Sequence, residues 1–248
     1  MKLRGWASCL LVVAALAFSS PCFAAGHARH AAFDLQPLSH QPGSVPWNIV
    51  VLLTVLTLLP AIVLSMTPFV RLLVVFHFLR QALGTQTTPS NQTLIGLSLI
   101  LTFFLMQPVG AAINDAALVP YQQGHTDAMG AVERASVPTR QFMLKYAREK
   151  DLALFLELAK QPRPERAQDI PMRVVVPAYL ISELKAGFQI GAALYLPFLV
   201  VDMAVAAVTT SVGMLQLPPV VISTPLKILL FVMVDGWNLL VGSLMKSF

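Results

Sequence analysis

Three charged side chains interrupt the apolar sequence between residues 201 and 244, and their spacing could support ion pairing. Asp202 lies in a first apolar arm, and Lys227 and Asp235 lie in a second; residues 213–219, which contain a glycine and paired prolines, predict a turn between the arms. A charge at the centre of a lipid-exposed helix costs about 3 kcal/mol. We therefore expect the arms to face protein or a water-filled path. Because Asp202 and Lys227 are nearly equidistant from Leu215, we expect them to form a structural ion pair across a helical hairpin.

Two arginines could form a second polar group within another apolar stretch. Arg71 and Arg80 are nine positions apart, which places both on roughly one face of a helix. We interpret them as a buried polar stripe on an otherwise apolar helix. His77 lies between them and admits two interpretations, a proton carrier or a packed histidine with its hydrogen bonds satisfied.

Gly187 and Gly191 have the Gly-x-x-x-Gly spacing that lets two membrane helices approach closely. Glycine is common in membrane helices, so this pattern is a weak signal by itself. We expect these two residues to mark a close approach of helices.

Residue patterns typical of catalysis are absent from the sequence. It contains no His-Glu-x-x-His, Gly-x-Ser-x-Gly, Walker-type Gly-Lys-Ser or Gly-x-Gly-x-x-Gly. His77 and His125 are the only histidines after residue 46. The sequence therefore indicates a protein that is not an enzyme, and it predicts no cofactor and no metal site. The net charge of +5 comes without a basic run or a basic helix face, which argues against binding of nucleic acid.

Composition places the chain in a membrane setting. Of its 248 residues, 56% are hydrophobic and 12% are charged, whereas a soluble globular protein has about 25% charged residues. Long apolar segments are separated by short turns that contain glycine and proline. The pattern predicts an all-α fold of membrane-associated helical hairpins packed in a bundle.

The first 24 residues resemble a secretory signal peptide. Lys2 and Arg4 precede an apolar stretch that is too short to span a membrane, and small residues before position 25 suit cleavage after Ala24. An uncleaved anchor helix is the alternative. Both cysteines, Cys9 and Cys22, lie in this segment, so a cleaved chain would contain no thiol.

Four further regions follow in the predicted domain organisation. Residues 25–46 are polar and suit a flexible lead; a metal site formed by their three histidines is the alternative, but a disordered tail fits the composition better. Residues 47–119 form a first apolar hairpin region, whose turn has Gly84 for a helix C-terminus and Ser90 or Asn91 for the next N-cap. Residues 120–180 hold most of the charges and predict a small water-facing helical region. Residues 181–248 form the C-terminal hairpin, with a helix expected to start near Pro177.

The signal peptide would put the mature N-terminus outside the cytoplasm. Two crossings by the first hairpin would then leave residues 120–180 facing the periplasm. A count of positive charges favours the opposite side, but segments of this length translocate largely regardless of charge.

Two blocks of sequence resemble the FliP family of flagellar biosynthetic proteins. One is FVRLLVVFHFLRQALGTQTTPSNQTLIGLSLILTFFLMQPV; the other joins FMLKYAREKDLALF to SELKAGFQIGAALYLPFLVVDMAV and PLKILLFVMVDGWNLLVGSL. Together they cover most of the chain from about residue 46 to residue 248. The resemblance implies a pore-forming core subunit of the flagellar type III export gate, at the basal body in the bacterial inner membrane. It also implies a ring-like homo-oligomer, thought pentameric, that joins FliQ- and FliR-type membrane proteins and other export proteins and passes unfolded flagellar subunits.

The tip between the C-terminal arms is the expected gate loop, formed by Met214, Leu215, Gln216 and Leu217. Members of the family commonly carry consecutive methionines there, whereas this chain has one. Leucine and glutamine must therefore supply the rest of any seal, unless the tip is only a tight turn. Three alternatives stay open at this point: a subunit of a virulence injectisome, a small-solute transporter or channel, and a scaffold that conducts nothing.

Overall fold

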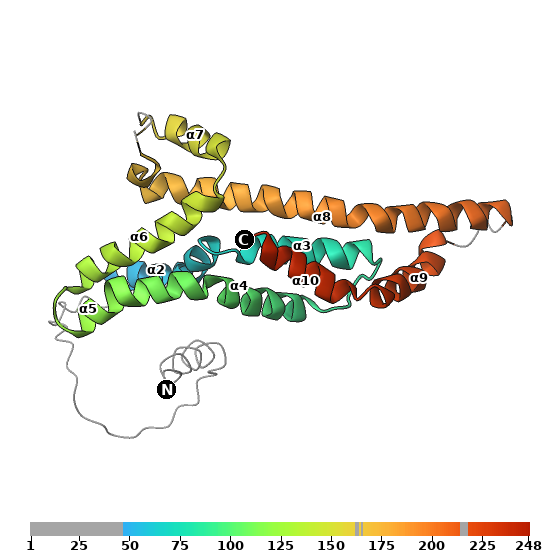
Figure 1. Ribbon diagram of the computed structural model, residues 1–248, viewed down its shortest axis with the longest axis horizontal. Coiled ribbons are helices and arrows are strands. Elements are labelled where there is room, and N and C mark those ends of the chain that lie inside the picture. Colours follow the sequence, from blue (N-terminus) through green and yellow to red (C-terminus); the bar gives the residue numbers. More distant parts are fainter. Residues whose placement is uncertain (1–46, 162–163, 165, 214–217) are drawn as a thin grey trace, which may run out of the picture. The chain divides into compact units, whose positions relative to one another are not determined.

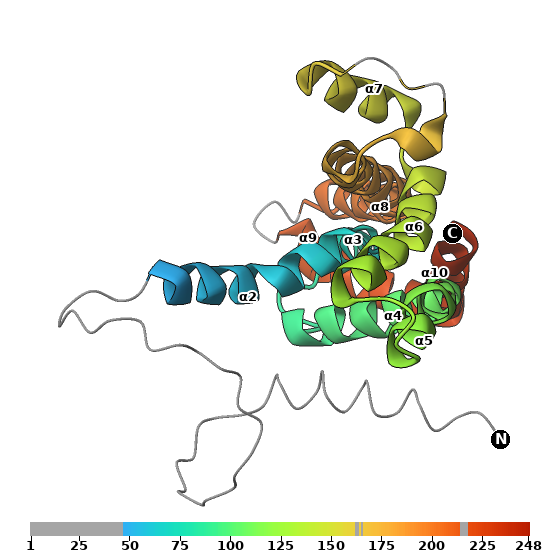
Figure 2. The same cartoon turned by 90° about the vertical axis from the view of Figure 1, so that its left-hand side faces the viewer.

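The computed structural model describes residues 47–161, 164, 166–213 and 218–248. The predicted signal peptide, the lead at residues 25–46 and the gate loop at residues 214–217 lie outside the described residues. Within the described part the chain is all-α, with helices joined by short connections and no strand. Residues 47–248 form one unit, and Figures 1 and 2 show its helices in two perpendicular views.

The first described helix, α2 (Trp47–Ser65), is apolar and has no buried residue. It contains Pro60, which removes one backbone hydrogen bond but is tolerated in membrane helices. Its exposed fraction is 53% or more at Leu53, Leu56 and Leu59, for example. A helix with apolar side chains on every side must be covered by lipid or by other proteins.

Helix α3 (Phe69–Ala82) lies at the centre of the larger core, between α8 (Met172–Ser211) and α4 (Asn91–Ile113). Leu72, Val75 and Phe76 are fully buried. This core also receives side chains from α9 (Pro219–Met233) and α10 (Gly236–Lys246). The first hairpin region therefore contributes the central helix of this core.

The turn between α3 and α4 has the predicted chemistry. Gly84 adopts a positive φ of 76°, which suits the residue just after a helix end. Ser90 caps α4, where its side chain accepts a hydrogen bond from the Thr93 N–H at 3.3 Å. At its far end α4 continues through a π-helix, Asn114–Leu118, into the short α5 (Val119–Gln122).

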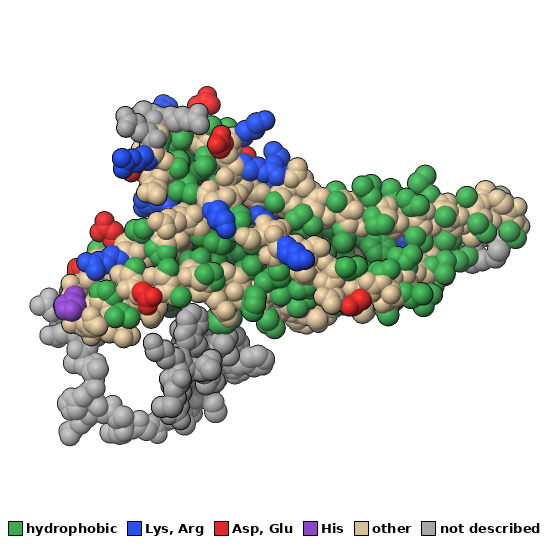
Figure 3. All heavy atoms as spheres, viewed as in Figure 1, with side chains coloured by type: hydrophobic (Ala, Val, Ile, Leu, Met, Phe, Trp, Pro, Cys, Tyr) green, Lys and Arg blue, Asp and Glu red, His purple; other side chains and the backbone are tan. Residues whose placement is uncertain are grey.

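The charged middle region folds as helices around a second, smaller core. It comprises α6 (Ala128–Tyr146) and α7 (Glu149–Leu158), which both contact α8, and the 3₁₀ turn Ala167–Asp169, which contacts α6. Met143, Leu156 and Tyr179 are among its buried members. Charged side chains are concentrated over this part of the surface in Figure 3, as the composition of residues 120–180 predicts.

The C-terminal hairpin differs from the prediction at two places. Helix α8 begins at Met172, before the predicted start at Pro177, because the proline is accommodated inside the helix. The second arm is not continuous: it breaks between α9 and α10 with a bend of 67°. Asp235 adopts a left-handed backbone with φ of 52° at this corner, and Gly236 follows it. Among non-glycine residues, Asp and Asn tolerate this conformation best.

Three helical segments are long and apolar enough to cross a membrane: Trp47–Ser65, Asn91–Gln122 and Met172–Ser211. The bent pair α9 and α10 would make a fourth if it counts as one broken span. The structure is therefore that of an all-α membrane protein.

Candidate functional site

The two arms of the C-terminal hairpin are joined by an ion pair whose lysine is buried and whose carboxylate is partly exposed. Lys227 Nζ of α9 donates a hydrogen bond of 2.5 Å to Asp202 Oδ2 of α8. Ser223 Oγ donates to the other carboxylate oxygen at 2.6 Å. Lys227 is 2% exposed, and the Asp202 side chain is 26% exposed. The structure thus brings together the two residues that lie at nearly equal distances from Leu215 in the sequence.

This cluster depends on helical spacing as well as on charge. Ser223 and Lys227 are four residues apart on α9, so both lie on one face. Ser223 is fully buried on that face. Asp235, the third charge of the hairpin, is exposed at the corner after α9 and has no salt bridge within the described part of the chain.

Beyond the ion pair, the ends of α8 and α9 lead toward the predicted gate loop. Helix α8 ends at Ser211, and Gly213 follows with a φ of 80°, whereas α9 begins at Pro219 after Pro218. Met214, Leu215, Gln216 and Leu217 connect these ends and lie outside the described residues. The arrangement therefore shows where the loop begins and ends, not its conformation.

The hydroxyl groups near this tip bond back to their own helix. Thr209 and Thr210 donate to the carbonyl of Ala206, and Ser211 donates to that of Ala207, at 2.7 to 3.0 Å. Their hydrogen-bonding capacity is thereby largely used within α8. Val212 is 70% exposed next to them. The described approach to the loop thus carries no ionic group and little free polarity.

A second buried ion pair, between Arg71 of α3 and Glu183 of α8, was not predicted from the sequence. Glu183 is fully buried and Arg71 is 5% exposed. The other guanidinium nitrogen, Nη1, donates to the main-chain oxygen and the hydroxyl of Ser247 at 3.4 and 3.3 Å. The Phe248 ring centroid lies 3.9 Å from the guanidinium carbon.

Some hydrogen-bonding capacity stays unused around this pair. Arg71 Nε, Glu183 Oε2 and the Tyr179 hydroxyl are buried without a protein partner. Such groups are costly unless they are satisfied. Spacing along α8 could have revealed Glu183, because it precedes Gly187 and Gly191 by four and eight residues and so shares their face.

Gly187 and Gly191 lie where α8 approaches α3. A Cβ atom at Gly187 would lie 3.2 Å from Val74, and one at Gly191 would lie 2.5 Å from the ring of Phe78. The close approach therefore occurs between helices of the same chain. Contact at Gly191 leaves no room for a side chain unless the Phe78 ring moves.

Arg71 and Arg80 bond to different neighbours. Arg80 Nη1 donates to Asn91 Oδ1 at 2.6 Å, and its Nη2 donates to His77 Nδ1 at 3.0 Å. Arg80 is only partly buried and joins the end of α3 to the start of α4. Partial burial, followed by the positive charge of Arg80, lowers the pKa of His77. This favours a neutral, packed histidine.

A junction between α7 and α8 also escaped the sequence analysis. Ser182 Oγ donates to Asp151 Oδ2 at 2.6 Å, and it accepts a hydrogen bond from the Arg148 N–H at 2.9 Å. Asp151 and Ser182 are both buried. These bonds attach the charged middle region to the same helix that carries Glu183 and Asp202. Among the described residues, no group of three His, Cys, Asp or Glu side chains could hold a metal ion.

Comparison with known proteins identifies what the chain is similar to. The family model described as the FliP family matches residues 52–244. A flagellar biosynthetic protein FliP of Pectobacterium carotovorum is 49% identical over 217 residues, which cover 86% of this chain and 83% of the relative. The protein of that name from Bacillus subtilis is 50% identical over 201 residues, which cover 81% of this chain and 91% of the relative. The one from Aquifex aeolicus is 45% identical over 203 residues.

Proposed function

The chain belongs to the FliP family, and on this premise we propose that it functions in flagellar type III export as a pore-forming subunit. Its place is a membrane at the flagellar apparatus, which we take to be the bacterial inner membrane at the basal body. The pore passes unfolded flagellar subunits. The relatives are flagellar biosynthetic proteins by name, which favours the flagellar system over a virulence injectisome.

The observation that carries this proposal is the distribution of charged and apolar side chains on the C-terminal hairpin. Two charges between its arms, Asp202 and Lys227, neutralise each other, while the outward faces of both arms carry many exposed apolar side chains. Val200 and Met203 of α8, and Val232 of α9, are each 65% exposed or more. Apolar surface of this extent requires lipid or protein to cover it.

We propose that further copies of the chain cover much of this surface, in a ring that is pentameric by resemblance to the family. FliQ- and FliR-type membrane proteins and other export proteins would complete the assembly. Closed rings are the usual form of homo-oligomers with a central passage. In such a ring the tips between α8 and α9 would converge on the passage.

A gate at these tips must pass an unfolded chain and retain ions between passages. Flexible apolar side chains can adapt to a chain of varying width, and methionine is the most adaptable of them. A narrow apolar constriction also closes to ions by dewetting when it is empty. Met214, Leu215, Gln216 and Leu217 are the residues that we assign to this role.

Replacing these four residues with Gly and Ser tests the gate. The variant should assemble as the parent does, because Asp202 and Lys227 still hold the arms, but cells that express it should become permeable to ions and small solutes. A matched control carries the same replacement at residues 123–126, in the connection between α5 and α6. If the tip variant assembles normally and stays as impermeable as the control, the loop is not the seal. Selective passage of one solute by the parent would instead indicate a transporter.

A further inference from the structure

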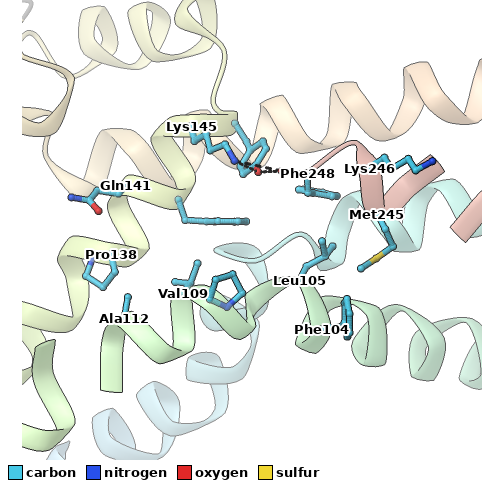
Figure 4. A pocket seen from close by; sticks show the side chains of 13 residues that line it. Phe104, Leu105, Val109, Ala112, Pro138, Gln141, Lys145, Met245, Lys246 and Phe248 are labelled. Carbon is cyan, nitrogen blue, oxygen red and sulfur yellow. Dashed lines mark hydrogen bonds between the residues drawn. The ribbon is translucent and has the colours of Figure 1, made fainter. Parts of the chain in front are cut away.

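An apolar groove of about 680 Å³ lies between α4, α6 and α10, away from the α8–α9 tip. Phe104, Val109 and Ala112 line it from α4, Phe142 lines it from α6, and Met245 lines it from α10. Figure 4 shows α4 side chains such as Leu105 and Val109 on one side, with Lys145 and Phe248 across from them. Its volume lies within the range of about 300–1,000 Å³ that is typical of small-molecule sites.

The charges that border this groove have one sign. Lys145 and Lys246 are among the lining residues, and no Asp or Glu is. Both lysines are exposed, and the described part of the chain offers neither of them an Asp or Glu within salt-bridge distance. Lys145 Nζ donates to the Tyr146 hydroxyl at 2.8 Å and to the Phe248 main-chain oxygen at 3.5 Å. Even if Phe248 carried a carboxylate, one positive charge would be left over.

The groove also lies where apolar spans meet the charged region. Helix α4 belongs to the candidate span Asn91–Gln122, and α10 belongs to the bent pair that could form another. Helix α6 does not qualify as a span, and it carries Lys145 in its last turn. Tyr146 and Phe248 add aromatic rings that contact each other, with centroids 5.3 Å apart. Lysines and aromatic rings at the end of apolar spans are typical of the membrane–water interface.

From these three features we propose that the groove binds an anionic phospholipid. One acyl chain occupies the apolar floor between Phe104, Val109 and Phe142. The phosphate lies near Lys145, and Lys246 adds a second positive charge to the lining of the groove. Basic pockets between membrane helices bind acidic headgroups in this way. The proposal does not depend on the pore function, because it rests on a different face of the unit.

Native mass spectrometry of the full chain, purified from membranes in its assembled form, tests the proposal. The probes are phosphatidylglycerol and phosphatidylcholine with identical acyl chains. The parent should retain the anionic lipid preferentially. Each lysine near an acidic headgroup contributes about fivefold in binding, so Lys145→Gln with Lys246→Gln should remove most of the preference. The matched control is Lys185→Gln, which removes an exposed lysine of α8 outside the groove and should change nothing.

A second variant tests the apolar floor independently of charge. Ala112→Trp places a large ring in the groove from an exposed position, so it should lower retention of both lipids without disturbing the core. Phosphatidylglycerol with a photoreactive acyl chain should label peptides that contain residues 104–112 and 138–146. Equal retention of the two lipids by the parent would overturn the proposal, as would unchanged preference in the double lysine variant. Labelling of the isolated chain but not of the assembly would assign the groove to a protein partner instead.

Discussion

Arg71 of α3 pairs with Glu183 of α8 in the core, where the Glu183 carboxylate is fully buried and the Arg71 guanidinium is almost fully buried. The pair joins the central helix to the longest one, and Arg71 also donates hydrogen bonds to Ser247, the residue that follows α10. Its position links the first apolar hairpin region to the C-terminal one. We therefore expect it to control whether these two parts fold together.

Removing one partner of this pair should be far more damaging than removing both. Arg71→Met leaves Glu183 buried without its counter-charge, and Glu183→Leu leaves the guanidinium unpaired; either loss costs about 3–5 kcal/mol of folding free energy. Replacement of both by apolar residues of similar volume is often neutral. We expect the double variant to regain most of the thermal stability, measured in detergent by loss of the folded, assembled species. Equal damage in the single and double variants would show that the charges themselves are required.

The pair of Asp202 and Lys227 should behave as a unit that holds the hairpin together. Asp202→Ala leaves an almost fully buried ammonium group without its carboxylate, so assembly should fall sharply. The exchanged variant, with Asp202→Lys and Lys227→Asp, restores opposite charges and should recover part of the assembly. Recovery should be incomplete, because Ser223 donates to the carboxylate in its present position.

Asp235→Asn is the matched control for the hairpin charges. It also removes an acid near α9, but this one is exposed, and asparagine tolerates the left-handed backbone found there. The amount of assembled complex on a native gel should therefore match the parent. If the exchanged variant recovers no assembly, the loss of the Asp202–Lys227 pair does not explain the assembly defect of Asp202→Ala.

Gly191 should tolerate no side chain. Gly191→Ala would bring its Cβ atom to 2.5 Å from the Phe78 ring, whereas Gly187→Ala meets Val74 at 3.2 Å. We expect losses of about 1–3 kcal/mol for the first change and less for the second. Gly96→Ala has open space around it and serves as the control in α4. Phe78→Ala removes the Cγ and Cδ2 atoms that the new Cβ would meet, so Gly191→Ala should cost less thermal stability in this background than in the parent. An equal cost in both backgrounds would mean that the clash does not explain the loss.

Local sequence signals were sufficient for part of this structure. Ser90 capping and the positive φ of Gly84 follow from short-range chemistry, and the Asp202–Lys227 contact follows from equal distances to a turn. The contact of Arg71 with Glu183 spans 112 positions, and nothing in the sequence between them sets its register. The break at Asp235 has a local signal, the Asp-Gly pair, but the apolar residues on both sides suggested one continuous helix.

Cysteine cross-linking offers the most direct test of the pore. If the segment before Ala25 is removed, the mature chain has no thiol. The intact mass of the membrane-purified protein should first be measured, to show that residues 1–24 are missing. A single cysteine at Gln216 should then cross-link to an exported subunit stalled in transit. One at Ser243, on α10, should do so much less, because α10 lies beyond the bend in the second arm and away from the tip. Equal yields at both positions would mean that the loop does not line the path of the exported chain.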